Sequence, residues 1–172
     1  MTQTNPMRSL RIAKVVVNIG VGESGEKLLR AEKLLEKLTG QKPVRTIAKK
    51  KIPVWGVKRG EPIGCKVTLR KKKAEEFLRR AFEAVDNRIS AKSFDNDGNL
   101  SFGVHEYIDF PDMKFDPEIG MFGMDISVEI ERPGYRIKRR RLQKRKIPTR
   151  HKVRREEAME FIKEKFEVDI LS

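Results

Sequence analysis

The chain has 172 residues, a single cysteine and a formal net charge of +14 at pH 7. One cysteine excludes an internal disulfide and a multi-cysteine zinc site, and no stretch approaches the roughly 18 to 20 apolar residues of a membrane span. The first residues, MTQTNPMRSLRI, lack the apolar core of a secretory signal, so we expect a cytoplasmic protein with no membrane partner. The length suits one domain, which we predict over residues 1–172.

Apolar patterning predicts strands and helices along the whole chain. β-branched residues before Gly20 indicate a first strand, and leucines at helical spacing before Gly40 indicate a helix that ends there. The predicted elements, in chain order, are a strand at 13–19, a helix at about 26–38, a strand at 43–48, a loop at 49–60, a strand at 63–70, a helix at 74–85, strands at 100–106 and 124–131, and a closing helix with Ala158, Phe161, Ile162 and Phe166. This order predicts an α+β fold. We expect a two-layer sandwich in which a mainly antiparallel sheet carries helices packed on one face and long basic loops.

Positive charge is concentrated in two windows. Residues 132–155 hold thirteen Lys and Arg and no acid, and residues 42–73 hold twelve against one acid, Glu61. Like charges at this density destabilise a compact fold unless a polyanion compensates them, and nucleic acid is the polyanion that we expect. A membrane surface is disfavoured, because it requires bulky apolar anchors and only Leu142 and Ile147 lie near the densest run.

RNA fits the predicted layout better than DNA. The clearest helix, at 74–85, carries Glu75 and Glu76 among its arginines, which makes it a poor reader of the DNA major groove. Basic loops around a small sheet favour RNA. Trp55 either stacks on an unpaired base or anchors its loop to the core, and Tyr135 has the same two possibilities. A DNA-compacting protein remains an alternative.

The sequence contains no catalytic constellation. Residues 20–25 match the G-x-G-x-x-G pattern of a dinucleotide-binding turn, which makes an NADP-binding enzyme the alternative function. Glu23 would place a negative charge beside the pyrophosphate, and the expected ribose-binding acid is absent, so a plain glycine-rich turn is favoured. His105 and His151 lack ligand spacing, and Cys65 fits a core position in a strand. We therefore expect no metal, no cofactor and no enzymatic activity.

Motifs spread over about residues 8–168 match a known family in order. They are KVVVNIGVG at 14–22, TGQKP at 39–43, GEPIGCKVTLR at 60–70 and RPGYR at 132–136. With these motifs the chain resembles the ribosomal protein L-five family, which binds 5S rRNA in the large subunit. The basic run after RPGYR resembles the archaeal and eukaryotic branch of that family.

The resemblance implies a structural role in the central protuberance of the cytoplasmic large ribosomal subunit. Implied partners are 5S rRNA, large-subunit rRNA, neighbouring ribosomal proteins, the tRNA in the peptidyl site, and a small-subunit head protein at an intersubunit bridge near residues 109–123. The residues implied for 5S rRNA are Lys14, Asn18, Gln41, Lys42, Lys66 and Thr68. The loop at 48–64 would touch the tRNA elbow through Lys49, Lys50, Lys51, Trp55, Lys58 and Arg59. Additional rRNA contacts are expected from Arg132, Tyr135, Arg136, Arg139, Arg140, Arg141, Lys144 and Arg145.

Overall fold

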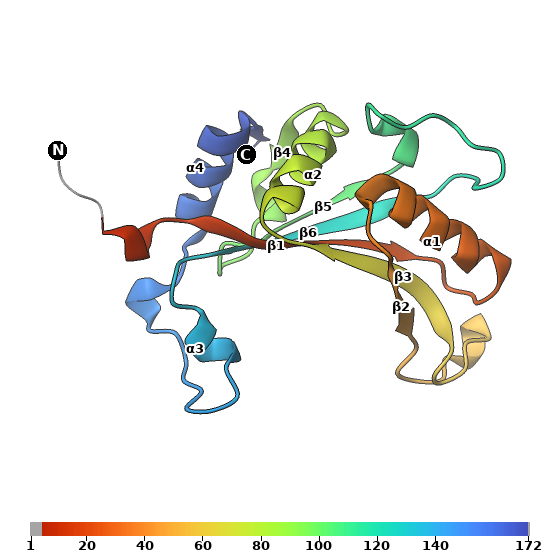
Figure 1. Ribbon diagram of the computed structural model, residues 1–172, viewed down its shortest axis with the longest axis horizontal. Helices are drawn as coiled ribbons and strands as arrows, with labels where there is room; N and C mark the ends of the chain where they lie inside the picture. Colours follow the sequence, from red (N-terminus) through yellow and green to blue (C-terminus); the bar gives the residue numbers. More distant parts are fainter. Residues whose placement is uncertain (1–4, 172) are drawn as a thin grey trace.

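A five-stranded sheet with helices against one face forms the centre of the molecule (Figure 1), in a computed structural model that describes residues 5–171. Its strands are β1 (Arg11–Gly20), β2 (Val44–Ile47), β3 (Pro62–Leu69), β5 (Leu100–Val104) and β6 (Met124–Glu131), in the spatial order β2-β3-β1-β6-β5. All four neighbouring pairs are antiparallel. The helices are α1 (Glu26–Thr39), α2 (Lys72–Glu83), α3 (Arg136–Arg139) and α4 (Arg155–Phe166). The predicted α+β fold with a mainly antiparallel sheet is therefore confirmed.

The core lies between the sheet and helices α1, α2 and α4, because the apolar residues of each strand alternate toward that side. On the central strand β1 these residues are Val15, Val17 and Ile19, all fully or almost fully buried. Helix α1 buries Leu28, Ala31, Leu34, Leu35 and Leu38, which adds Leu34 to the predicted apolar face. The helix ends at Gly40, whose left-handed φ of 62° lets its N–H donate to the Glu36 carbonyl at 2.8 Å.

Aromatic residues fill the other half of the core, beneath α2 and α4. The Phe82 ring contacts Phe166 of α4 edge-on, with ring centroids 5.2 Å apart, and stacks on Phe102 of β5. Tyr107 is fully buried, and its hydroxyl accepts a hydrogen bond from the Asp116 N–H at 2.8 Å. This bond fixes the long turn between β5 and β6 against the core.

Three short features were missed by the sequence patterns. Strands β4 (Arg88–Ser90) and β7 (Asp169–Leu171) form a separate two-stranded parallel sheet, and α3 lies within the basic run. Elements of three or four residues are too short to show a period of 2 or 3.6. The strand predicted at 100–106 ends earlier, at Val104, because its partner β6 begins at Met124 and leaves nothing further to pair with.

None of the helices within residues 5–171 has the length and apolar character needed to cross a bilayer.

Candidate nucleic-acid interface

One face of the five-stranded sheet is not covered by α1, α2 or α4, and we call it the open face (Figure 1). The β1 and β3 residues that alternate with the buried ones lie on it, including Lys14, Asn18, Lys66 and Thr68. Asn18 is paired with Lys66 on β3 on one side, and the β6 residue Asp125 is its partner on the other. Four of the six residues implied for 5S rRNA therefore share this face.

The remaining two lie just beyond the end of strand β2. Val44 pairs with Lys66, so Gln41 and Lys42 precede β2 at the end of the sheet where Thr68 lies. Lys42 is exposed and Gln41 is half-buried. The six residues thus form one neighbourhood along β1, β3 and the turn before β2.

Side chains on the open face differ in how they are engaged. Lys14 Nζ lies 3.0 Å from Glu129 Oε2, out of line for a hydrogen bond, so the contact is an ion pair between two half-exposed groups. Within residues 5–171 no hydrogen bond or ion pair engages the side chains of Asn18, Lys66 or Thr68. Their donors and acceptors are free for a ligand, because an amide and a hydroxyl each both donate and accept.

The loop between β2 and β3, residues 48–61, forms a small ordered hairpin. The Ile52 N–H donates to the Val57 carbonyl at 2.9 Å, and Gly56 closes the intervening turn with a φ of 67°. Val57 is buried, but Trp55 at the turn is 73% exposed. The interpretation of Trp55 as a core anchor is therefore wrong, and its ring faces solvent. The predicted loop cations are also exposed, namely Lys49, Lys50, Lys51, Lys58 and Arg59.

Glu61, the one acid of this basic window, fixes the base of the loop. Its carboxylate accepts from the Lys58 N–H at 2.9 Å and from the Ser24 hydroxyl at 2.7 Å. The Lys58 N–H, and then the Ser24 hydroxyl, lower the pKa of Glu61 below its usual 4.5. The sequence analysis missed this role, although a single acid among twelve bases was a signal for it.

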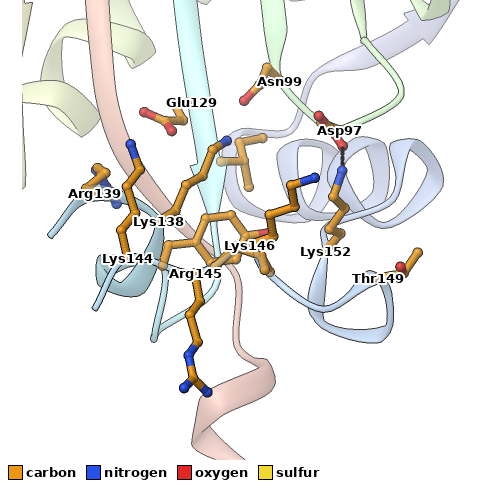
Figure 2. Close-up of a pocket in the computed structure, with 13 residues that line it drawn as sticks. Asp97, Asn99, Glu129, Lys138, Arg139, Lys144, Arg145, Lys146, Thr149 and Lys152 are labelled. Atoms are coloured by element: carbon orange, nitrogen blue, oxygen red, sulfur yellow. Dashed lines mark hydrogen bonds and ion pairs between the residues drawn. The ribbon is translucent and has the colours of Figure 1, made fainter. Parts of the chain in front are cut away.

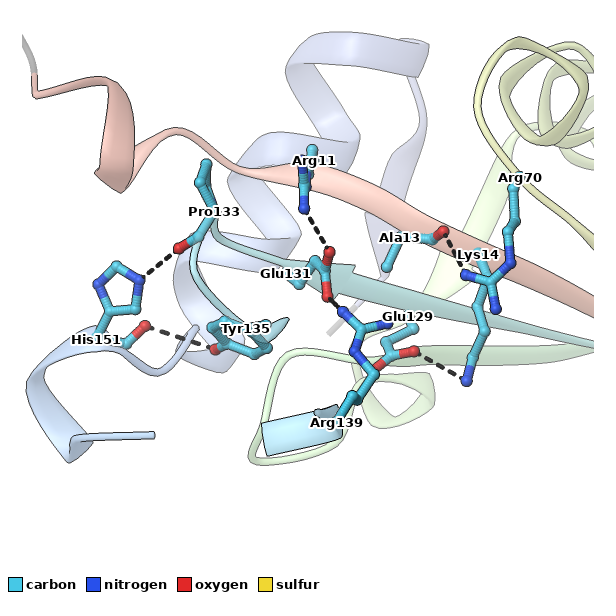
Figure 3. A network of polar contacts seen from close by, with 10 residues as sticks. All are labelled: Arg11, Ala13, Lys14, Arg70, Glu129, Glu131, Pro133, Tyr135, Arg139 and His151. Atoms are coloured by element: carbon cyan, nitrogen blue, oxygen red, sulfur yellow. Dashed lines mark hydrogen bonds and ion pairs between the residues drawn. The ribbon is translucent and has the colours of Figure 1, made fainter. Parts of the chain in front are cut away.

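Residues 132–155, which we call the basic segment, fold back toward the open face (Figures 1 and 3). Glu131, at the end of β6, is buried and binds two arginines, Arg11 on β1 and Arg139 on α3. The Arg11 contact is 2.8 Å. The next residue, Arg132, is also buried and pairs with Glu157 of α4 at 2.8 Å. Acids at both ends of the segment therefore hold it in place.

Tyr135 and His151 bring the two halves of the basic segment together (Figure 3). The Tyr135 hydroxyl accepts from the Val153 N–H at 3.2 Å, and His151 Nε2 lies 2.8 Å from the Pro133 carbonyl, to which it donates. Burial raises the pKa of Tyr135. Tyr135 therefore has the packing role foreseen as one of its two possibilities.

The structure divides the eight predicted rRNA contacts of the basic segment into two groups. Arg132 and Arg139 are engaged by Glu157 and Glu131, and Tyr135 is half-buried. The other five remain at the surface, with Arg140 half-buried and bonded to the Gln143 carbonyl at 2.9 Å, and the rest exposed: Arg136, Arg141, Lys144 and Arg145. The sequence analysis did not anticipate that acids outside the run would neutralise part of it.

The glycine-rich turn does not present the amides that a dinucleotide requires. The Val21 and Gly22 N–H groups both donate to the Ile63 carbonyl of β3, at 3.0 and 2.8 Å. The turn is followed by an antiparallel sheet instead of a parallel β-α-β unit. Burial raises the pKa of the Cys65 thiol to about 11, so it remains protonated at neutral pH. In residues 5–171 no three His, Cys, Asp or Glu side chains are grouped to hold a metal ion.

Fold and surface together define an α+β protein with a one-sided sheet and cationic loops, a scaffold in class. Comparison with known proteins gives the family. The model described as Ribosomal protein L5 matches residues 5–58, and the model for the C-terminus of the same ribosomal protein family matches residues 62–161. Strands from both regions are neighbours in the same sheet, since β1 lies between β3 and β6.

Curated relatives match over almost their whole length. Large ribosomal subunit protein uL5 of Sulfurisphaera tokodaii is 58% identical over 172 residues, which cover 99% of this chain and 97% of the relative. The proteins of the same name from Methanococcoides burtonii and Methanosphaera stadtmanae are each 52% identical, over 97% and 96% of this chain and 99% of each relative. The chain belongs to the uL5 family of large-subunit ribosomal proteins.

Family membership confirms several expectations. The chain is a structural ribosomal protein involved in translation, and the NADP-binding enzyme considered as an alternative is wrong. The expected location, the large ribosomal subunit in the cytoplasm, is likewise confirmed by the names of the relatives.

Proposed function

We propose that this large-subunit protein binds 5S rRNA through its open face, within the central protuberance and beside large-subunit rRNA and neighbouring ribosomal proteins. The observation that carries the proposal is the free polar row on the open face, with cationic segments projecting on the same side at both ends of the sheet (Figure 1). The wide, shallow minor groove of an RNA helix presents base edges and 2′-hydroxyls that a flat polar surface can contact.

The open-face residues divide the binding task by their chemistry. The Asn18 amide both donates and accepts, so it reads a base edge or a 2′-hydroxyl. Lys66 and Lys42 place positive charge where phosphates would lie, and phosphate contacts fix register without reading sequence. Lys14 contributes once Glu129 releases it, because its 3.0 Å ion pair is half-exposed.

The loop at residues 48–61 is proposed to touch the elbow of the tRNA in the peptidyl site. Trp55 supports this role because the hairpin holds its ring out in solvent, where it can stack on an exposed base. The five cations around it would engage the tRNA backbone. A loop fixed in advance by Glu61 loses less conformational entropy when it binds.

The turn at 109–123 is proposed to face a protein of the small-subunit head and to form the intersubunit bridge. It exposes Phe115 and Met121, together with the carboxylates of Asp112 and Glu118. An acidic, partly apolar surface on an otherwise basic protein suits a basic protein partner better than it suits RNA.

The proposal for 5S rRNA is tested by matched single substitutions in a binding assay. Asn18→Ala should weaken 5S rRNA binding by about 5- to 150-fold, corresponding to about 1–3 kcal/mol, and should leave an unrelated structured RNA little affected. Lys33→Ala, an exposed position on α1 away from the open face, should leave both affinities close to wild type. Equal effects of the two substitutions would contradict a role for the open face.

A further inference from the structure

A pocket of about 1030 Å³ lies between the basic segment and the adjoining strand β6 (Figure 2). The basic segment supplies most of its lining, including Tyr135, Lys138, Lys144, Lys146 and Ile147. The turn before β5 contributes Asp97 and Asn99, and β6 contributes Glu129. Ligand pockets commonly measure about 300–1,000 Å³, so the volume is at the upper end of that range.

The walls of this pocket are held by bonds within the chain. Glu131 binds Arg139 on one side, and Lys152 Nζ lies 2.9 Å from Asp97 Oδ1 on the other. The Arg145 N–H donates to the Ile137 carbonyl at 3.1 Å, which closes the turn between them. A cavity built in this way exists before a ligand arrives, so that little ordering is required on binding.

The charges that line the pocket favour an anion. Its two carboxylates already have cationic partners, because Asp97 is paired with Lys152 and Glu129 with Lys14. Lys138, Lys144 and Lys146 have no ion pair within residues 5–171. Figure 2 shows these three lysines extending toward the side where Glu129 and Asn99 lie, whereas Arg145 extends away from it. Three free ammonium groups therefore converge on one cavity.

The remaining lining suits more than a bare phosphate. Ile147 is buried beside the cavity, and the half-buried Tyr135 ring adds aromatic surface. The Asn99 amide nitrogen donates to Asp95 at 2.7 Å, which leaves its carbonyl oxygen as an acceptor, turned toward the pocket in Figure 2. Cations for phosphates, an aromatic and apolar wall, and an acceptor for a base edge are the groups that recognise a single unstacked nucleotide.

We propose that this pocket captures one flipped-out nucleotide from a bulge or single-stranded segment of rRNA. The proposal rests on the RNA-binding function proposed above and adds a second kind of recognition to it. The open face reads the surface of a folded helix, but a stacked base in a duplex cannot enter the pocket. The basic segment thereby distinguishes RNA that carries an unpaired nucleotide from RNA that is fully paired.

Two RNA hairpins test the proposal, one fully paired and one with a single bulged nucleotide, each of the four nucleotides being tried in turn. The wild-type chain should bind at least one bulged hairpin about 10-fold tighter than the paired one, in line with the usual worth of stacking one base. Lys144→Ala with Lys146→Ala should reduce this preference to about 1-fold. Arg141→Ala with Arg150→Ala removes the same charge from exposed positions outside the pocket, and should weaken both RNAs equally while the preference remains.

A crosslinking experiment provides a direct readout. A hairpin with 5-iodouridine at the bulge, irradiated in complex with the wild-type chain, should crosslink to Tyr135, as mapped by mass spectrometry. Equal bulge preferences in both double variants, or a wild-type chain that binds 5S rRNA but shows no preference among the hairpins, would overturn the pocket proposal and leave the 5S rRNA proposal standing. Failure to bind any RNA, 5S rRNA included, would overturn both.

Discussion

Buried Glu131 stabilises the basic segment by joining it to the sheet. Its carboxylate lies at the end of β6, between Arg11 from the first strand and Arg139 from α3 (Figure 3). Thirteen like charges in 24 residues repel one another, and a fixed acid beneath them offsets part of that repulsion. The segment is therefore organised by contacts within the protein before any RNA binds.

Replacement of this acid should loosen the segment. We expect Glu131→Gln to lower the free energy of unfolding by about 1–3 kcal/mol, because a charged hydrogen-bond acceptor is lost at a buried position. Chemical denaturation measures this change, and limited trypsin digestion should show faster cleavage within 136–146. Glu160→Gln, at an exposed position of α4, should change stability by less than about 0.5 kcal/mol. Identical digestion patterns for the two variants would contradict the anchoring role.

Glu61 gives the loop at 48–61 a dependence on pH. Because the folded protein lowers its pKa below 4.5, the contribution of Glu61 to stability is complete above about pH 4.5 and is lost as the pH falls through the lowered value. Trp55, the one tryptophan of the chain, reports on loop motion. Its fluorescence anisotropy should fall as the solution is acidified below pH 4.5. Glu61→Gln should show the lower anisotropy already at pH 7, and a variant that behaves like wild type would argue against this coupling.

At the scale of elements, strand β3 depends on close approach to both of its neighbours. A Cβ atom on Gly64 would lie 2.7 Å from the Ile19 carbonyl oxygen and 2.9 Å from Thr46 Oγ1. Gly20, directly opposite on β1, has open space where its Cβ would be. The two glycines therefore differ in what they tolerate, although they are register partners.

This difference predicts unequal effects of the same substitution. Gly64→Ala should destabilise the fold by about 1–3 kcal/mol, because β3 lies between β1 and β2 and cannot move away from either one. Gly20→Ala should cost clearly less. Thermal denaturation followed by circular dichroism compares the two. Similar melting temperatures for both variants would mean that the sheet relaxes around the added methyl group.

How well each element could be predicted depends on its length and periodicity. Helix α1 and strand β6 repeat their apolar residues over several turns or pairs, and the structure has both close to where the pattern placed them. The positions of Asn18 and Thr68 on one uncovered face follow from alternation once β1 and β3 are paired. The anchoring of Arg139 by Glu131 could not be predicted, because it depends on how the chain folds back, which local patterns do not encode.

At the scale of the whole molecule, charge and layers are separated in the same direction. The helices cover one side of the sheet, and the basic segment and the 48–61 loop project on the other (Figure 1). The basic windows lie on the uncovered side, while the rest of the chain sums to a negative charge, since 42–73 and 132–155 together exceed the net +14. This arrangement orients the protein toward a polyanion and leaves its helical side for other contacts.

Binding through this charged side should depend steeply on salt. If about 6 to 10 phosphates are neutralised, affinity for 5S rRNA should fall on the order of 10³- to 10⁵-fold between 50 and 200 mM salt. Filter binding across a salt series measures the slope. Lys66→Ala should reduce the slope by about one unit if Lys66 contacts a phosphate, whereas Lys33→Ala on α1 should leave it unchanged.

Competition between RNAs tests the central claim most directly, namely that the open face and its flanking cations fit one folded RNA. Labelled 5S rRNA bound to the wild-type chain is titrated, at near-physiological salt, with unlabelled 5S rRNA and with an unrelated structured RNA of equal length. We predict that the unrelated RNA will need at least about 10³-fold more material to displace the label, the lower end of the usual specificity range for nucleic-acid-binding proteins. Displacement at equal concentrations would show that the surface attracts charge without recognising shape, and would contradict the account.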